Sequence, residues 1–119
     1  MTMLQETLGK DTMTAEWVPL CGQTDLDDGA MMAFEIGDYQ VALYRVDGSY
    51  YATTNVCSHA YTLLTDGWLE DRLVECPLHG AQFDVASGEV VRGPADCPVQ
   101  TYEVRIKDDT VEVKLDQPA

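Results

Sequence analysis

Both histidines of the chain stand close to a cysteine, in two short motifs of mirrored composition. The first motif is Cys57-Ser-His59, and the second, after sixteen intervening residues, is Cys76-Pro-Leu-His79. Thiolate and imidazole groups are ligands that proteins use for zinc and for iron. Two loops that each supply one thiolate and one imidazole can converge on one site with two sulfur and two nitrogen donors. These four residues are therefore the candidate metal ligands.

Two kinds of metal centre accept this set of donors. A zinc site with two Cys and two His is common in small domains. Zinc fingers, however, usually pair Cys with Cys and His with His across a helix, and this sequence offers no such helix. A two-iron, two-sulfide cluster can instead take two Cys on one iron and two His on the other. The order and spacing favour the cluster over a zinc-stabilised binding module without redox activity.

The two motifs resemble the signature of the Rieske family, and within it the small ferredoxins that serve bacterial aromatic-ring-hydroxylating dioxygenases. The residues that carry this resemblance are Cys57-Ser-His59, Cys76-Pro-Leu-His79-Gly80, Gln82-Phe83-Asp84, Gly93-Pro94 and Pro98. The prolines fall where the family has a proline-containing loop over its cluster. The similarity extends over about residues 17–115. It implies one Rieske-type [2Fe-2S] cluster as the cofactor, bound by Cys57, His59, Cys76 and His79.

The departures from the family pattern bear on the reduction potential. Rieske proteins of quinol-oxidising complexes carry an extra Cys in each loop, which form a disulfide clamp, and the corresponding positions here are Thr62 and Leu78. The same relatives place hydroxyl donors near the cluster, where this chain has Ala81 and Phe83. Fewer donors leave the reduced, more negative cluster less stabilised. We expect a potential near the low end of the Rieske range, which spans about −150 to +300 mV.

The surroundings of the cluster can also be anticipated. Tyr61, Leu78 and Pro94 are expected to form an apolar rim against which a partner docks. Backbone N–H groups of both ligand loops, including that of Gly80, are expected to point at the sulfur atoms.

Several other residues of reactive type have a simpler interpretation. Cys21 and Cys97 are expected to be small buried apolar residues in a reducing compartment. Trp17, Trp68 and the six tyrosines are interpreted as core and strand residues rather than as electron relays.

The remaining composition excludes several classes of enzyme. With both histidines assigned to the cluster, a mononuclear iron site of the two-His-one-carboxylate type cannot form on this chain. The sequence also has no Gly-x-Gly-x-x-Gly fingerprint for a flavin or nicotinamide. One-electron transfer without catalysis remains. The resemblance implies a flavin-dependent NAD(P)H reductase as donor and a terminal Rieske oxygenase of an aromatic dioxygenase system as acceptor. The alternative is the Rieske small subunit of another oxidoreductase, such as an assimilatory nitrite reductase.

The net charge limits the possible partners further. Twenty-one acidic and seven basic residues give a formal charge of −14. Nucleic acid is a poor partner, because phosphate binding needs Lys and Arg. The acidic residues keep the protein soluble or steer it toward basic faces of other proteins. No apolar run approaches the ~20 residues of a membrane-spanning helix, and the N-terminus lacks a basic-then-apolar leader. We expect a cytoplasmic monomer that binds neither membrane nor nucleic acid.

The elements that must position the two loops have the pattern of short β-strands. Gly37-Asp38, Asp47-Gly48 and Asp108-Asp109 mark hairpin turns between them. No segment has a sustained helical repeat, although residues 24–29 are expected to form one turn of helix. The expected strands cover residues 30–36, 39–46, 50–53, 68–70, 72–75, 102–107 and 111–115. The chain is therefore predicted to be all-β, an antiparallel sandwich or barrel, and the resemblance implies the Rieske-like fold.

The chain divides into a tail and one domain. Residues 1–12 are expected to be an N-terminal tail, and residues 13–119 to form the Rieske domain. Within that domain, about residues 55–84 are expected to be a cluster-binding lobe inserted into the β scaffold, because both ligand motifs lie there between Gly, Pro and Asp residues.

Overall fold

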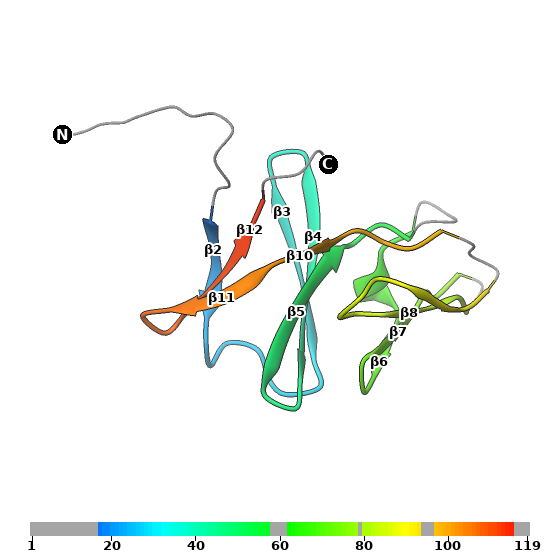
Figure 1. Ribbon diagram of the computed structural model, residues 1–119, viewed down its shortest axis with the longest axis horizontal. Helices are drawn as coiled ribbons and strands as arrows, with labels where there is room; N and C mark the ends of the chain where they lie inside the picture. Colours follow the sequence, from blue (N-terminus) through cyan, green and yellow to red (C-terminus); the bar gives the residue numbers. More distant parts are fainter. Residues whose placement is uncertain (1–16, 58–61, 79, 94–96, 116–119) are drawn as a thin grey trace.

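The computed structural model describes residues 17–57, 62–78, 80–93 and 97–115, which form three antiparallel β-sheets (Figure 1). The first sheet has the order β10-β5-β4-β3, with β3 Met31–Ile36, β4 Tyr39–Val46, β5 Ser49–Thr54 and β10 Thr101–Tyr102. The second has the order β11-β12-β2, with β2 Trp17–Gly22, β11 Val104–Lys107 and β12 Thr110–Lys114. The third has the order β6-β7-β8-β9, with β6 Trp68–Glu70, β7 Leu73–Glu75, β8 Gln82–Asp84 and β9 Val90–Arg92. A 3-10 turn, η2, covers Leu64–Asp66. The all-β prediction is confirmed.

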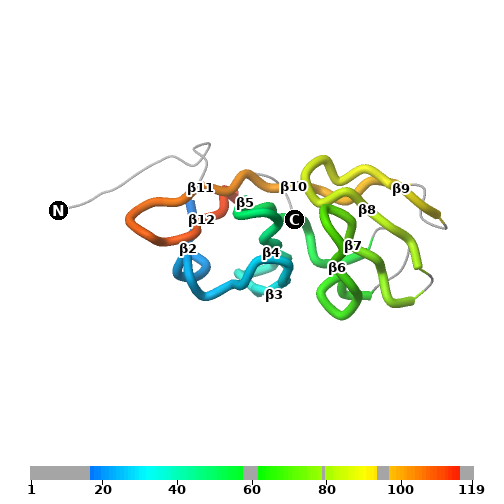
Figure 2. Tube along the Cα trace, turned by 90° about the horizontal axis from the view of Figure 1, so that it is seen from below, coloured from blue at the N-terminus to red at the C-terminus, as the bar shows by residue number. Residues whose placement is uncertain are grey.

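The first sheet lies in the middle of the molecule, between the other two (Figures 1 and 2). We call the third sheet, β6 to β9, the lobe. Strand β9 of this sheet lies after residue 84, which is the end predicted for the inserted cluster-binding segment. The boundaries predicted for the tail and for the inserted segment stay predictions.

Strand β4 connects the two halves of the structure because it is buried on both faces. Side chains alternate between the faces of a strand. Val41 and Leu43 pack into one core together with residues of β12. Ala42 and Tyr44 point the other way and belong to a second core, together with Phe83 of the lobe. The lobe is therefore packed directly against the central sheet.

Aspartates and glycines make the tight turns of the scaffold. Asp47 and Gly48, between β4 and β5, have φ angles of 51° and 82°. Asp108 and Asp109, between β11 and β12, have φ angles of 51° and 66°. Two consecutive residues with positive φ are the geometry of the two-residue hairpin turn whose twist matches that of the flanking strands. Both hairpins expected at these positions are present.

Two expectations about secondary structure need correction. The run 102–107 was expected to be one strand, but Tyr102 pairs with Ala52 of β5, and only Val104–Lys107 pairs with β12. The chain passes from the first sheet to the second at Glu103, so the regular alternation of this run conceals a change of sheet. Residues 24–29 form bends and turns, and the described residues contain no α-helix.

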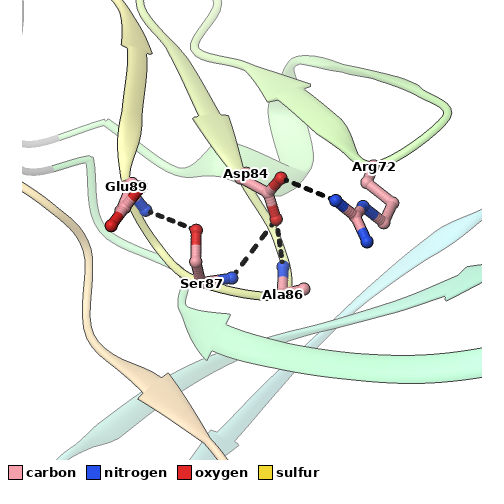
Figure 3. A network of polar contacts seen from close by, with 5 residues as sticks. All are labelled: Arg72, Asp84, Ala86, Ser87 and Glu89. Atoms are coloured by element: carbon pink, nitrogen blue, oxygen red, sulfur yellow. Dashed lines mark hydrogen bonds and ion pairs between the residues drawn. The ribbon is translucent and has the colours of Figure 1, made fainter.

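Asp84 orders the turn that joins β8 to β9 (Figure 3). Its Oδ1 accepts hydrogen bonds from the backbone N–H groups of Ala86 and Ser87, at 2.8 and 3.2 Å. The Ser87 hydroxyl oxygen accepts one from the N–H of Glu89, at 3.2 Å. The other carboxylate oxygen of Asp84 lies 3.3 Å from the Arg72 guanidinium. One carboxylate thus ties the β8–β9 turn to the β6–β7 turn.

Phe83 supports the lobe, and its truncation should destabilise the protein. The side chain is fully buried on the face of β8 that packs toward β4. Phe83→Ala is expected to reduce the free energy of unfolding by about 3–5 kcal/mol, the usual cost of removing a buried phenyl ring. The measurement is the urea midpoint followed by circular dichroism. Val91→Ala is the control, because Val91 is 53% exposed, and its midpoint should hardly move. Equal shifts in both variants would contradict this description of the core.

Candidate metal centre

The first ligand loop begins directly after β5. Cys57 is buried, with 3% of its surface exposed. Its backbone N–H donates a hydrogen bond to the carbonyl of Thr62 at 2.8 Å. Val56 and Leu63 form an isolated antiparallel bridge just outside this bond. The entry and exit of the loop are therefore held together as in a hairpin.

The second ligand loop, between β7 and β8, is closed in the same way. The N–H of Cys76, which is fully buried, donates to the carbonyl of Ala81 at 2.8 Å. In both loops the cysteine is thus bonded to the residue five positions later. Gly80 adopts a positive φ of 79°, and its N–H donates to the Cys76 carbonyl at 3.1 Å. The expectation that this N–H points at a sulfur was wrong, because the tight turn itself uses it.

Asn55, which belongs to no recognised motif of the sequence, anchors the first loop through a buried network. Its side-chain Nδ2 donates to Thr65 Oγ1, and its Oδ1 accepts the N–H of Thr65, both at 2.9 Å. Its backbone carbonyl accepts the N–H of Leu64, and its own N–H donates to the Gln40 carbonyl, both at 2.7 Å. Asn55 is fully buried. A polar residue two positions before a candidate ligand is a weak signal that could have drawn attention to it.

The two loops meet at Gly67. A Cβ atom at this position would lie 1.9 Å from the carbonyl oxygen of Glu75 and 3.0 Å from Cδ of Pro77. Only glycine allows the backbone that leaves the first loop to lie this close to the residues on either side of Cys76. This contact brings the exit of one candidate ligand loop against the entry of the other.

The two thiols lie in apolar surroundings. Cys57 and Cys76 form no disulfide and belong to the same buried core, with Tyr44 and Phe83. The positions expected to lack hydroxyl donors, Ala81 and Phe83, are both fully buried. Tyr44 is a buried hydroxyl in this core, and its OH lies 2.8 Å from Thr53 Oγ1. Because Thr53 donates its own proton to the Thr54 carbonyl, Tyr44 is the donor in this pair, and burial raises the pKa of its phenol.

The remaining predicted site residues have different positions. His59 and His79 lie outside the described residues, as do Tyr61 and Pro94. Leu78 is 49% exposed, so the described member of the predicted apolar rim does reach the surface. Within the part of the chain that the structure describes, no three residues of the His, Cys, Asp and Glu types form a metal-binding group.

Three residues depart from the buried positions expected for them. Cys97 is exposed in the segment before β10, and Cys21 is only partly buried on β2. Partial burial and the nearby Asp25 carboxylate raise the pKa of the Cys21 thiol, which makes it a poorer nucleophile. Trp68 does lie on a strand, as predicted, but its side chain is 60% exposed and is not part of a core. Period-two alternation places it on the solvent face of β6.

The family model for the Rieske [2Fe-2S] domain matches residues 16–103, which include both loops, the first and third sheets, and β2 of the second sheet. The chain belongs to the Rieske [2Fe-2S] domain family. Relatives within this family are similar over nearly their whole length. The ferredoxin component of the naphthalene 1,2-dioxygenase/salicylate 5-hydroxylase systems of Ralstonia sp is 36% identical over 104 residues, which are 87% of this chain and 100% of the relative. The biphenyl 2,3-dioxygenase ferredoxin component of Rhodococcus jostii is 40% identical over 97 residues, which are 82% of this chain and 91% of the relative.

A solved structure confirms the Rieske fold. A chain of the complex of reduced oxygenase and oxidized ferredoxin in carbazole 1,9a-dioxygenase is 32% identical, with a TM-score of 0.78. The similarity covers 81% of this chain and 99% of that chain. Within the described residues, no helix has the length and apolarity needed to cross a membrane.

This Rieske domain carries one [2Fe-2S] cluster, and its described residues fit that cofactor. Two buried thiols in a shared core are suited to one iron of such a cluster. The paired closure of the loops and the contact at Gly67 hold both thiol-bearing segments next to each other. Iron–sulfur chemistry benefits from these surroundings because the apolar core limits the access of water to the sulfurs.

Replacing Asn55 should loosen the first ligand loop. Asn55→Ala leaves the N–H of Thr65 without its acceptor, at a cost of about 1–3 kcal/mol. We expect a lower thermal midpoint and faster loss of the visible absorption of the cluster on heating. Thr65→Ser is the control, because serine retains both the N–H and the hydroxyl that bind Asn55. If Asn55→Ala kept its cluster as long as Thr65→Ser, the anchoring role would be contradicted.

Proposed function

We propose that this protein is the ferredoxin component of an aromatic-ring-hydroxylating dioxygenase system. It carries single electrons from a flavin-dependent NAD(P)H reductase to a terminal Rieske oxygenase and catalyses no reaction itself. The observation that carries the proposal is the extent of the similarity to dioxygenase ferredoxin components, which covers 82–87% of this chain and 91–100% of those relatives. The Rieske domain match alone spans residues 16–103.

For the ligands, we propose that Cys57 and Cys76 hold one iron and that His59 and His79 hold the other. The burial of both thiols and the matched closure of their loops support the sulfur half of this assignment. The spacing of the two motifs supports the nitrogen half, because each histidine lies within three residues of its cysteine. Neutral imidazoles leave the centre with less negative charge than four thiolates would.

The remaining side chains set the conditions for electron transfer. Ala81 and Phe83 are buried and have no hydroxyl group to offer to the reduced cluster. Leu78 extends from the second loop into solvent and gives a partner an apolar contact beside the centre. Net charge −14 promotes fast, salt-sensitive encounters with basic faces of partner proteins. These features fit a carrier that binds each partner briefly.

We also propose that the protein works as a cytoplasmic monomer. None of its four cysteines, all of which lie in the described residues, forms a disulfide, as expected in a reducing compartment. The proposed donor depends on NAD(P)H, which is a cytoplasmic reductant.

Substitution of His79 tests the ligand assignment through the reduction potential. The native midpoint is expected near the low end of the Rieske range. His79→Cys moves the centre toward the all-cysteine type, whose potential is about −400 mV, so the midpoint should fall by hundreds of millivolts. Protein-film voltammetry measures both values. Cys97→Ser is the control, because Cys97 is exposed and outside the proposed ligand set. A His79→Ala variant that kept a native Rieske spectrum would contradict the assignment.

Reconstitution tests the proposed function. Purified protein is mixed with NADH, a ferredoxin reductase of a ring-hydroxylating system and its terminal oxygenase, and formation of the dihydroxylated product is measured. We expect turnover to depend on the concentration of this protein and to stop when it is omitted or when its cluster is removed. Full turnover without it would contradict the proposal. Tight co-purification with a large nitrite-reducing subunit would favour the alternative.

A further inference from the structure

Trp68 is an exposed aromatic residue on the outer edge of the lobe. It is 60% exposed, more than any other large apolar residue that the structure describes. Strand β6 is an edge strand of its sheet, so one long side of it has no neighbouring strand within that sheet (Figure 1). Single exposed apolar residues are common on protein surfaces. The surroundings of Trp68 therefore decide whether it has a role.

Those surroundings are acidic. Glu75 is the cross-strand partner of Trp68 in the β6–β7 pair, and its Oε1 accepts a hydrogen bond from Gln82 Nε2 at 3.1 Å. Glu70 is two positions further along β6 and points to the same face, and it is exposed. Asp66, at the end of η2, is also exposed. The ion pairs found among the described residues, Arg72–Asp84, Arg105–Glu112 and Lys114–Glu103, include none of these three carboxylates.

The other tryptophan of the chain, Trp17, differs from Trp68 because cations of its own chain lie near its ring. The Arg105 guanidinium lies 4.2 Å from the ring centre of Trp17, and the ammonium group of Lys114 lies 6.0 Å from it. The fold thus supplies Trp17 with cations from its own chain. Among the described residues, no cation lies over the ring of Trp68. An indole next to carboxylates attracts a cation both through its π face and through Coulomb forces.

Trp68 lies one strand away from the segment that carries Cys76, although the indole and the Cys76 side chain point to opposite faces of the sheet. Trp68 is paired with Glu75, which directly precedes Cys76. With strands about 4.8 Å apart and a rise of about 3.4 Å per residue, the Cα atoms of Trp68 and Cys76 lie on the order of 6 Å apart. The contact of Gly67 with the Glu75 carbonyl makes this region rigid.

We propose that Trp68 is the docking anchor for a redox partner that presents an arginine from a basic surface. The partner's guanidinium stacks on the indole while Glu70 pairs with its charge. This inference rests on the proposed function, because it assigns a surface to the exchange of electrons with another protein. Tryptophan and arginine are the residues that most often dominate binding energy at protein interfaces. The net charge of −14 favours a partner that is basic at its contact face.

The test compares Trp68→Ala with the native protein in binding and turnover. The native and variant proteins are titrated with the purified oxygenase and with the reductase, and KM for the carrier is measured in the reconstituted reaction. We expect Kd and KM to rise about tenfold for at least one partner, while kcat at saturation, the visible spectrum and the reduction potential stay unchanged. Unchanged binding of both partners would overturn the proposal.

Two matched controls separate docking from general surface effects. Ile106→Ala removes an apolar side chain that is 42% exposed on β11, at the opposite side of the molecule from β6 (Figure 1), and it should leave Kd unchanged. Glu70→Gln should weaken binding and reduce its dependence on salt, whereas Glu35→Gln on β3 should do neither. Equal effects of Trp68→Ala and Ile106→Ala would overturn the proposal. Turnover with the native protein tests the proposed function. The ratio of Kd and of KM between Trp68→Ala and the native protein tests the docking anchor, so the two failures are distinguishable.

Discussion

The metal centre depends on two equivalent backbone hydrogen bonds, one at each cysteine. Cys57 N–H to the Thr62 carbonyl and Cys76 N–H to the Ala81 carbonyl are both 2.8 Å long and both span five residues. Each bond closes a loop at the cysteine that is proposed to bind iron. A thiol held this way needs little reorganisation to bind iron, because its backbone is already fixed. The close approach at Gly67 then sets the distance between the loops.

The rest of the fold keeps this pair of loops in place. β4 is buried on both faces, and it packs the lobe on one side and the sheet β11-β12-β2 on the other. Asn55 links the end of β5 to η2, so the first loop inherits the rigidity of the central sheet. Asp84 orders the turn that joins β8 to β9 and ties it to the β6–β7 turn through Arg72. An electron carrier benefits from such rigidity because small structural change between oxidised and reduced states allows fast transfer.

Much of this structure could be predicted from local sequence patterns. Short alternating strands and Asp-Gly or Asp-Asp turns have local physical causes, so β3, β4, β5 and the last hairpin follow from the sequence. The cysteine and histidine spacing likewise indicates the family and its cofactor. The change of sheet at Glu103, the network of Asn55, the use of the Gly80 N–H and the exposure of Trp68 and Cys97 depend on tertiary neighbours. No local pattern contains that information, so those features required the three-dimensional structure.

The central claim is that two thiolates and two imidazoles share one pair of irons. Pulsed EPR of the dithionite-reduced protein tests this most directly, because nitrogen nuclei bonded to the reduced iron produce hyperfine couplings. The account predicts a Rieske-type signal with couplings from two histidine nitrogens, both of which are lost when His59 and His79 are replaced. An EPR-silent protein that contains zinc, or a cluster signal without directly coupled nitrogen, would contradict it.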